Sequence, residues 1–119
     1  MNRANLDHPP ITFHLVPRDV WEARSSGNQY LPDAFDSDGF IHCTDGEDEV
    51  IAVGNRYYTG DPRAYVVLSI ARDRLAAPVR YEDPAHVFPH IYGPLNLDAV
   101  VAVRSVRRDD QGRFVEIGE

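Results

Sequence analysis

Residues 65–71 have the sequence YVVLSIA, and this stretch decides the fold. A short run of β-branched, aromatic and other apolar residues is typical of a buried strand. It is the clearest strand pattern in the sequence. The fold therefore contains a β-sheet, and the other elements are assigned outward from this strand.

The segment after this strand is predicted to add further strands. Residues 80–83 and 90–93 are two short candidates, separated by a loop that contains several prolines. Residues 100–106 and 113–117 flank the turn sequence DDQG, and this arrangement predicts a β-hairpin.

The segment before it is predicted to alternate strands with helices. Residues 12–16, TFHLV, form a first short strand. Pro17 suits the first position of a helix that runs to about Ser25 and stops at Gly27. Residues 40–43 form a second strand.

A second helix is predicted to begin at Thr44. Thr44 and Glu47 have the spacing of a capping box, and Gly60 is placed to end the helix. A helical stripe is partly formed by Val50, Ile51, Val53, Tyr57 and Tyr58. Two helices early in the chain and strands late in it predict an α+β fold with a largely antiparallel sheet.

The composition indicates one small globular domain. The chain has 119 residues, of which 43% are hydrophobic and 26% charged, enough for a single core. Residues 1–11 are predicted to be a disordered leader, and residues 12–119 the domain. No apolar run approaches the length of about 20 residues that spans a bilayer. With a single cysteine, Cys43, and no signal-peptide pattern, we expect a cytoplasmic location.

The charge argues against nucleic acid as a partner. All 12 basic residues are arginines, 19 residues are acidic, and the net charge is −7. Binding to nucleic acid depends on neutralising phosphates, which an acidic domain does poorly. The clustered Arg104, Arg107 and Arg108 are followed directly by Asp109 and Asp110. A small RNA end remains open as a partner.

Three predicted strands each carry a histidine among apolar neighbours: His14, His42 and His90. Alternate residues of a strand share a face, so His90 and Tyr92 point the same way. An unpaired imidazole in a core costs about 1–3 kcal/mol, so each ring needs a partner or a purpose. Each histidine alone fits a core residue bonded to backbone; together with Tyr92 they form a candidate shared site.

The sequence gives no sign of a metal site or of a nucleophilic cysteine. It has none of the HxxxH, HxH or CxxC spacings common among metal ligands, so we predict no metal. Cys43 alternates with His42 and therefore faces away from it. An apolar setting raises the pKa of a thiol, so Cys43 is assigned to packing.

Glu82 is the carboxylate that we expect at the site. It precedes the loop that leads to His90, and it shares a strand face with Arg80. The two side chains could pair or jointly hold a polar ligand. Asp83, directly before Pro84, is assigned to a turn.

Four stretches resemble the bacterial domain-of-unknown-function family 952. They are FHLVPRDVWEA, DGFIHCT, VVLSIARDRL and VRYEDPAHVFPHIYGPLNLDAVVAV, and the resemblance covers roughly residues 12–116. The family has no established activity. Its fold is similar to that of ADP-ribosyltransferases, which implies a split β-sheet with a cleft for nicotinamide dinucleotide (NAD) between its halves.

The resemblance implies roles for individual residues. His14 matches a histidine that holds ribose hydroxyls, and His42-Cys43-Thr44 matches a segment below the nicotinamide. The third motif matches residues 90–92, where the glutamate of the transferases is missing. A carboxylate stabilises the positive charge that develops as the glycosidic bond breaks. Ordinary protein ADP-ribosylation is therefore not expected.

Three functions follow as hypotheses. The first is a transferase, or the remnant of one, acting on an ADP-ribose or phosphate-bearing small molecule. Its catalytic candidates are His14, His42, His90, Tyr92 and Glu82. Its candidates for binding NAD or a similar molecule are His14, Thr44, Arg80 and Tyr92.

The second hypothesis is a non-catalytic module that binds a small ligand or a partner protein in the same cleft. The third is an enzyme similar to RNA-end phosphotransferases. It would need phosphate-binding arginines, for which Arg18 and Arg80 are the candidates.

Overall fold

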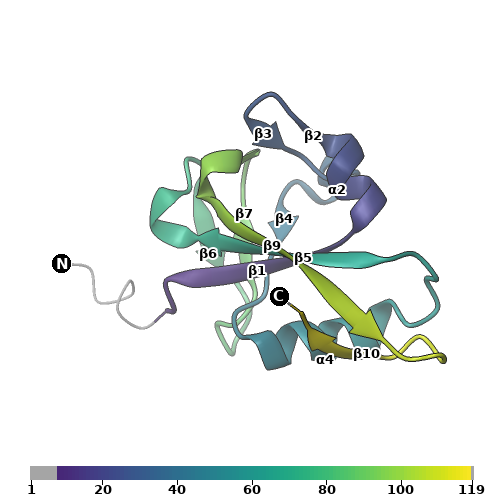
Figure 1. Ribbon diagram of the computed structural model, residues 1–119. Coiled ribbons are helices and arrows are strands. Elements are labelled where there is room, and N and C mark those ends of the chain that lie inside the picture. The colour runs from purple at the N-terminus through teal and green to yellow at the C-terminus, as the bar shows by residue number, and fades with distance from the viewer. Residues whose placement is uncertain (1–7, 119) are drawn as a thin grey trace.

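The most deeply buried strand is β5 (Tyr65–Ala71), in which every residue is buried. In the computed structural model, which describes residues 8–118, β5 lies between β1 (Ile11–Pro17) and β9 (Val100–Arg108) (Figure 1). With β10 (Phe114–Ile117) these strands form a four-stranded sheet whose paired strands are antiparallel. The predicted strand at residues 65–71 and the C-terminal hairpin are confirmed.

Two small antiparallel sheets accompany the four-stranded one. The first has the order β4 (Ile41–His42), β7 (Pro89–Ile91), β6 (Val79–Tyr81), and we call it the outer sheet. The second joins β2 (Ser25–Ser26), β3 (Gln29–Tyr30) and β8 (Leu95–Asn96). The α+β class and the largely antiparallel pairing are thus confirmed.

One residue pair connects the backbone of β1 to the chain just after β4. The Phe13 amide donates to the Thr44 carbonyl at 2.9 Å, and the Thr44 amide donates to the Phe13 carbonyl at 2.7 Å. The outer sheet is therefore fixed against the edge strand of the large sheet.

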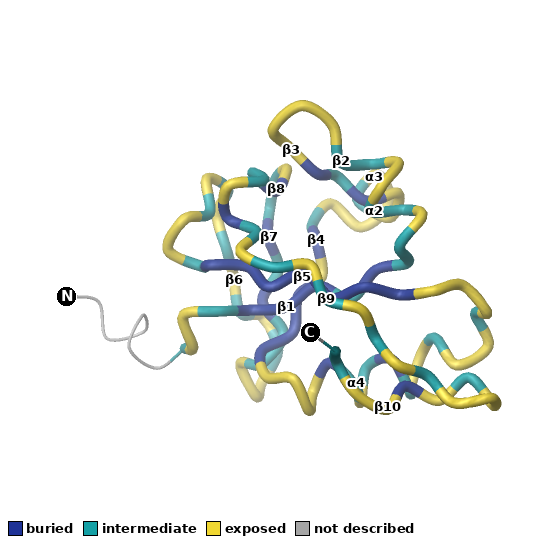
Figure 2. The backbone as a smooth tube through the Cα atoms, in the orientation of Figure 1, coloured by how far each residue is buried: buried dark blue, intermediate teal, exposed yellow. Residues whose placement is uncertain are grey.

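Side chains pack on both faces of the large sheet. Successive residues of β1 point alternately to the two faces. Phe13 packs with Val50 and Val67 beneath α4 (Glu47–Tyr57). On the other side Val16 belongs to the larger cluster, which includes Leu68 and the apolar residues of the outer sheet. Figure 2 shows the buried residues concentrated where these strands cross.

The helices differ in detail from the predicted ones. The first, α2 (Arg18–Arg24), begins one residue after Pro17. A short helix, α3 (Phe35–Asp38), lies in the predicted loop. Two short 3-10 helices are also present, at Arg72–Arg74 and Leu97–Ala99.

The capping box predicted at Thr44 is wrong. The N-cap of α4 is Gly46, and no side chain caps the helix. The backbone of Thr44 is instead paired with Phe13, and Glu47 forms an ion pair with Arg104 at 3.0 Å. Tertiary pairing overrides the local capping pattern here.

The boundary of the predicted leader also needs correction. Residues 1–7 lie outside the described residues. Arg72 donates hydrogen bonds to the carbonyls of Pro9 and Pro10, and β1 already begins at Ile11. Residues 8–11 therefore belong to the packed domain. Among residues 8–118, no helix is both long and apolar enough to cross a membrane.

Candidate functional site

The outer sheet presents three predicted site residues on one face. Its register places His90 opposite His42 on one side and opposite Arg80 on the other. Directly opposed residues of paired strands share a face. The alternate positions, Ile41 and Ile91, are fully buried in the core, so the histidines lie on the outer face.

Each of the two histidines is held by a carboxylate. His42 Nε2 lies 2.9 Å from Asp38 Oδ2, and His90 Nδ1 lies 3.2 Å from Glu82 Oε1. The Tyr92 hydroxyl donates to the same Glu82 oxygen. Since a carboxylate accepts the N–H, the second ring nitrogen of each histidine is left for other partners.

Aromatic rings pack around this pair. Phe40, two residues before His42, stacks on His90 with a centroid distance of 3.9 Å and an angle of 15°. The His42 and His90 ring centroids are 5.3 Å apart, with one ring edge-on to the other. The Arg80 guanidinium lies 5.1 Å from the centre of the Tyr92 ring.

The bond between Tyr92 and Glu82 shifts the pKa of both groups. The Tyr92 hydroxyl, followed by His90, lowers the pKa of the Glu82 carboxyl. The carboxylate in turn raises the pKa of the Tyr92 phenol. Near neutral pH, Glu82 is therefore an anion that holds two donors in place.

A cleft of about 530 Å³ adjoins the outer sheet. His42, Thr44 and His90 line it on the sheet side, while the last turns of α4 contribute Arg56, Tyr57 and Tyr58. Cavities of this size bind small organic molecules. The two carboxylate-held histidines thus border a space that a ligand can enter.

The structure brings together most of the predicted site residues. His42, His90 and Thr44 line the cleft, although Thr44 is largely buried. Glu82 and Tyr92 directly follow β6 and β7 and lie beside His90, with the Arg80 guanidinium over the Tyr92 ring.

His14 is the exception, and its predicted contact with a ligand is wrong. Its side chain lies in the core with 7% of the residue exposed. Its Nδ1–H donates to the His42 carbonyl at 2.6 Å, and its Nε2 accepts from the Tyr30 hydroxyl at 2.9 Å. Burial lowers the pKa of His14 to about 4, so the ring is neutral. His14 fixes the backbone of β4 instead of binding a ligand.

Sequence reasoning missed the residues that α3 and α4 bring to the site. Asp38 falls in the segment predicted as a loop, yet it lies four residues before His42, which was a usable signal. Tyr57 belongs to the apolar stripe predicted for the second helix, but it is 65% exposed at the cleft. Arg56 carried no signal beyond its charge.

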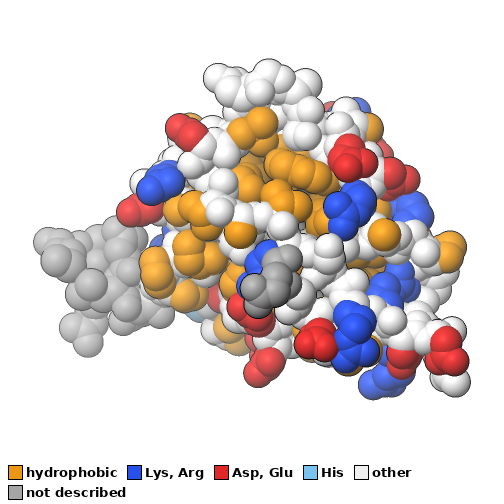
Figure 3. All heavy atoms as spheres, in the orientation of Figure 1, with side chains coloured by type: hydrophobic (Ala, Val, Ile, Leu, Met, Phe, Trp, Pro, Cys, Tyr) orange, Lys and Arg blue, Asp and Glu red, His pale blue; other side chains and the backbone are white. Residues whose placement is uncertain are grey.

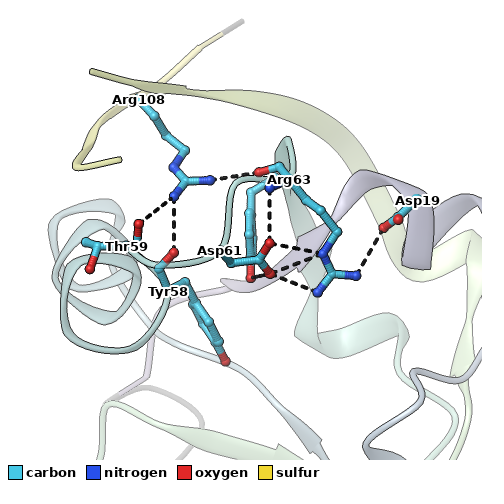
Figure 4. A network of polar contacts seen from close by, with 7 residues as sticks. Asp19, Tyr58, Thr59, Asp61, Arg63 and Arg108 are labelled. Carbon is cyan, nitrogen blue, oxygen red and sulfur yellow. Dashed lines mark hydrogen bonds and ion pairs between the residues drawn. The ribbon is translucent and has the colours of Figure 1, made fainter. Parts of the chain in front are cut away.

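A second cavity, of about 500 Å³, is lined by Arg63 and Arg108. Both arginines are bonded within the protein. Arg108 donates to the carbonyls of Tyr58, Thr59 and Arg63, and Arg63 is paired with Asp61 (Figure 4). These guanidinium groups are already used to tie loops together. Among residues 8–118, no group of three or more His, Cys, Asp or Glu side chains is arranged to hold a metal ion.

Fold and site together define a small α+β protein with a cleft bordered by two histidine–carboxylate pairs. The family model described as "Protein of unknown function (DUF952)" matches residues 15–103, so the chain belongs to this family. No curated protein matches the chain significantly.

Solved structures of protein CC0527 from Caulobacter crescentus share the fold. Its crystal structure is 21% identical with a TM-score of 0.74, covering 88% of this chain and 93% of that one. A crystal structure of a double mutant is 20% identical, with the same TM-score and coverage. A solution NMR structure is 20% identical with a TM-score of 0.68, covering 87% and 90%. This likeness establishes the fold alone.

Proposed function

We propose that the cleft binds a small nucleotide-type molecule, which combines a flat ring with a phosphate group. The observation that carries this proposal is the position of His42 and His90 on the wall of a cleft that also holds an exposed tyrosine, Tyr57, and an arginine. Each feature matches one part of such a ligand.

The tyrosines of α4 suit the flat ring. Tyr57 is 65% exposed, and both Tyr57 and Tyr58 line the cleft. Stacking on an aromatic side chain is worth about 1–3 kcal/mol per base and tolerates different bases. Other exposed large apolar side chains, such as Val101, lack this capacity to stack.

The phosphate can be held by Arg56, which lines the cleft opposite the two histidines. Within residues 8–118, the guanidinium of Arg56 makes no hydrogen bond or ion pair and lies 6.0 Å from the centre of the Tyr57 ring. Of the carboxylates that line the cleft with Glu49, Asp38 is already bonded to His42, and Asp83 accepts from two backbone amides. They repel an anion less than free carboxylates would.

Among such ligands, NAD and ADP-ribose are the ones that the resemblance to ADP-ribosyltransferases favours. His14 does not fit the role of a ribose ligand, because both ring nitrogens are bonded inside the core. The position of Glu82 bears on NAD and ADP-ribose as ligands. Glu82 carries a carboxylate beside residues 90–92, where the third motif lacks a glutamate, although its Oε1 is bonded to His90 and Tyr92. We include both molecules among the ligands to be tested.

Thermal denaturation with added ligand tests the proposal. AMP, ADP-ribose, NAD and inorganic phosphate are each added in increasing amounts. A ligand present at 100 times its Kd stabilises the fold by about 2.7 kcal/mol. We expect a shift with at least one nucleotide that weakens in Arg56→Ala and Tyr57→Ala.

Arg113→Ala is the matched control. Arg113 lies in the β9–β10 turn and does not line the cleft, and its side chain makes no hydrogen bond to another described residue. No shift with any nucleotide, or equal loss in all three variants, would contradict the proposal. A partner protein bound at this face without any nucleotide effect would favour the non-catalytic hypothesis.

A further inference from the structure

The two histidines at the cleft are tethered at different ring nitrogens. Asp38 binds His42 through Nε2, which leaves Nδ1, whereas Glu82 binds His90 through Nδ1, which leaves Nε2. A carboxylate on one nitrogen fixes the ring and stabilises its protonated form, as in catalytic triads. Two imidazoles prepared in this way lie with ring centroids 5.3 Å apart.

This arrangement fits a reaction that needs a base and an acid at the same time. In the hydrolysis of a phosphodiester, an entering oxygen loses a proton while a leaving oxygen gains one, roughly in line across phosphorus. Each transfer requires a nitrogen within about 2.6–3.2 Å of its oxygen. Neighbouring imidazoles on one cleft wall can serve both oxygens.

We propose that His90 and His42 are the base and the acid of a phosphodiesterase that acts on the nucleotide-type ligand. The inference rests on the function proposed above. The neutral Nε2 of His90 takes a proton from water, and the water oxygen forms a bond to phosphorus. The ester P–O bond breaks, and the leaving oxygen takes the proton of Nδ1 from the protonated ring of His42. The products are a phosphomonoester and an alcohol, and no oxidant, reductant or cofactor is consumed.

The charges around the site favour phosphoryl over glycosyl chemistry. Cleavage of a glycosidic bond uses a carboxylate that can face the reacting carbon. Both Asp38 and Glu82 are already bonded to a histidine. A transferring phosphoryl group instead needs positive charge on its oxygens. Arg56, at the cleft and without an ion pair among residues 8–118, can supply it.

The test is the hydrolysis of adenosine 2′,3′-cyclic monophosphate by the full-length protein, followed by ³¹P NMR. Acid–base catalysis contributes about 10²–10⁴-fold to a rate. We expect His42→Gln and His90→Gln each to lower kcat by about 10²-fold or more, with the Kd for AMP changed less than about threefold. His86→Asn is the control. His86 is exposed outside the cleft and has a φ of 55°, a value that asparagine tolerates.

The pH profile of kcat assigns the roles. A base must be deprotonated and an acid protonated, so the wild-type profile is bell-shaped. His90→Gln should lose the limb that rises with pH, and His42→Gln the limb that falls. The profile is shaped as well by the other charged and titratable groups that face the pair, namely Asp38, Glu49, Arg56, Tyr57, Tyr58, Arg80, Glu82, Asp83 and Tyr92.

The outcomes separate this inference from the function on which it rests. Binding of AMP without turnover of the cyclic ester would overturn the phosphodiesterase and leave the nucleotide site standing. Turnover that persists in both glutamine variants would also overturn it. Absence of turnover, together with no thermal shift by AMP, ADP-ribose or NAD, would remove both proposals.

Discussion

His14 and His90 occupy similar positions in two regions of the molecule, but their ring nitrogens differ in what they bind. Each lies on an antiparallel strand and packs against an aromatic ring. In the core, both nitrogens of His14 are bonded; on the outer sheet, a carboxylate binds one nitrogen of His90. The two histidines therefore differ in the number of bonded ring nitrogens, and His90 keeps one nitrogen for a further partner.

The largest effect should come from removing the core histidine. His14→Ala leaves a cavity and strips the Tyr30 hydroxyl and the His42 carbonyl of a partner. We expect the free energy of unfolding to fall by about 4 kcal/mol, measured by urea denaturation. His90→Ala should cost about 1 kcal/mol or less. Equal losses in the two variants would abolish the distinction between the regions.

Acid should reveal the same difference. Burial lowers the pKa of His14 from 6.5 to about 4, so between these values the unfolded chain binds a proton that the folded chain does not. Stability is then complete above pH 6.5 and falls by about 3 kcal/mol as the pH drops toward 4. Urea midpoints measured across this range should show the extra loss in the wild type and not in His14→Gln. If the urea midpoints of the wild type and His14→Gln changed equally with pH, His14 would not be the group that causes the loss.

The tight packing beneath α4 should respond to a single methyl group. A Cβ at Gly54 would lie 2.6 Å from Cγ of Phe114, whose ring is also in contact with Arg108. Overpacking costs about 1–3 kcal/mol, and the better helix propensity of alanine returns about 1 kcal/mol. We expect Gly54→Ala to lose about 1.5 kcal/mol by urea denaturation. Gly60→Ala, with open space around it, should be close to neutral.

The smallest effect should come from the outer sheet. Glu82→Ala removes the acceptor of the Tyr92 hydroxyl, so the pKa of this phenol should return toward its ordinary value of 10.0. Titration of the tyrosine ring carbons by ¹³C NMR measures the change. Glu116→Ala, on the distant strand β10, should leave Tyr92 unchanged. If the pKa of Tyr92 were unchanged in Glu82→Ala, the bond between Tyr92 and Glu82 would not form in solution.

Much of the sheet and part of the site could be predicted from the sequence. The apolar run at residues 65–71 is short and rich in β-branched residues, which favours a buried strand, and alternation placed His90 and Tyr92 on one face. The alternation of side chains along a strand does not predict which other segments cover each face of the sheet. The ring that seals His14 belongs to Tyr30, which comes from a different sheet, so the burial of His14 could not be foreseen.

The cleft was harder to predict because it depends on packing between elements that are distant in the chain. Tyr57 has the spacing of a core residue, but α4 packs against β1 and β10, and Tyr57 at its last residue is left exposed at the cleft. The space-filling view shows the same principle on the visible face, where apolar side chains from several segments gather into one surface (Figure 3). Patterns within a segment do not determine such surfaces.

The paired backbone bonds of Phe13 and Thr44 have a consequence for how the molecule opens. They are the bonds by which the edge of the large sheet holds the chain that leaves β4. If they open together with the bond from His14 to the His42 carbonyl, the outer sheet can loosen while β5 keeps both of its neighbouring strands. Native-state hydrogen exchange should then resolve two cooperative units, with the amides of β4 and β7 exchanging through a smaller opening than those of β5.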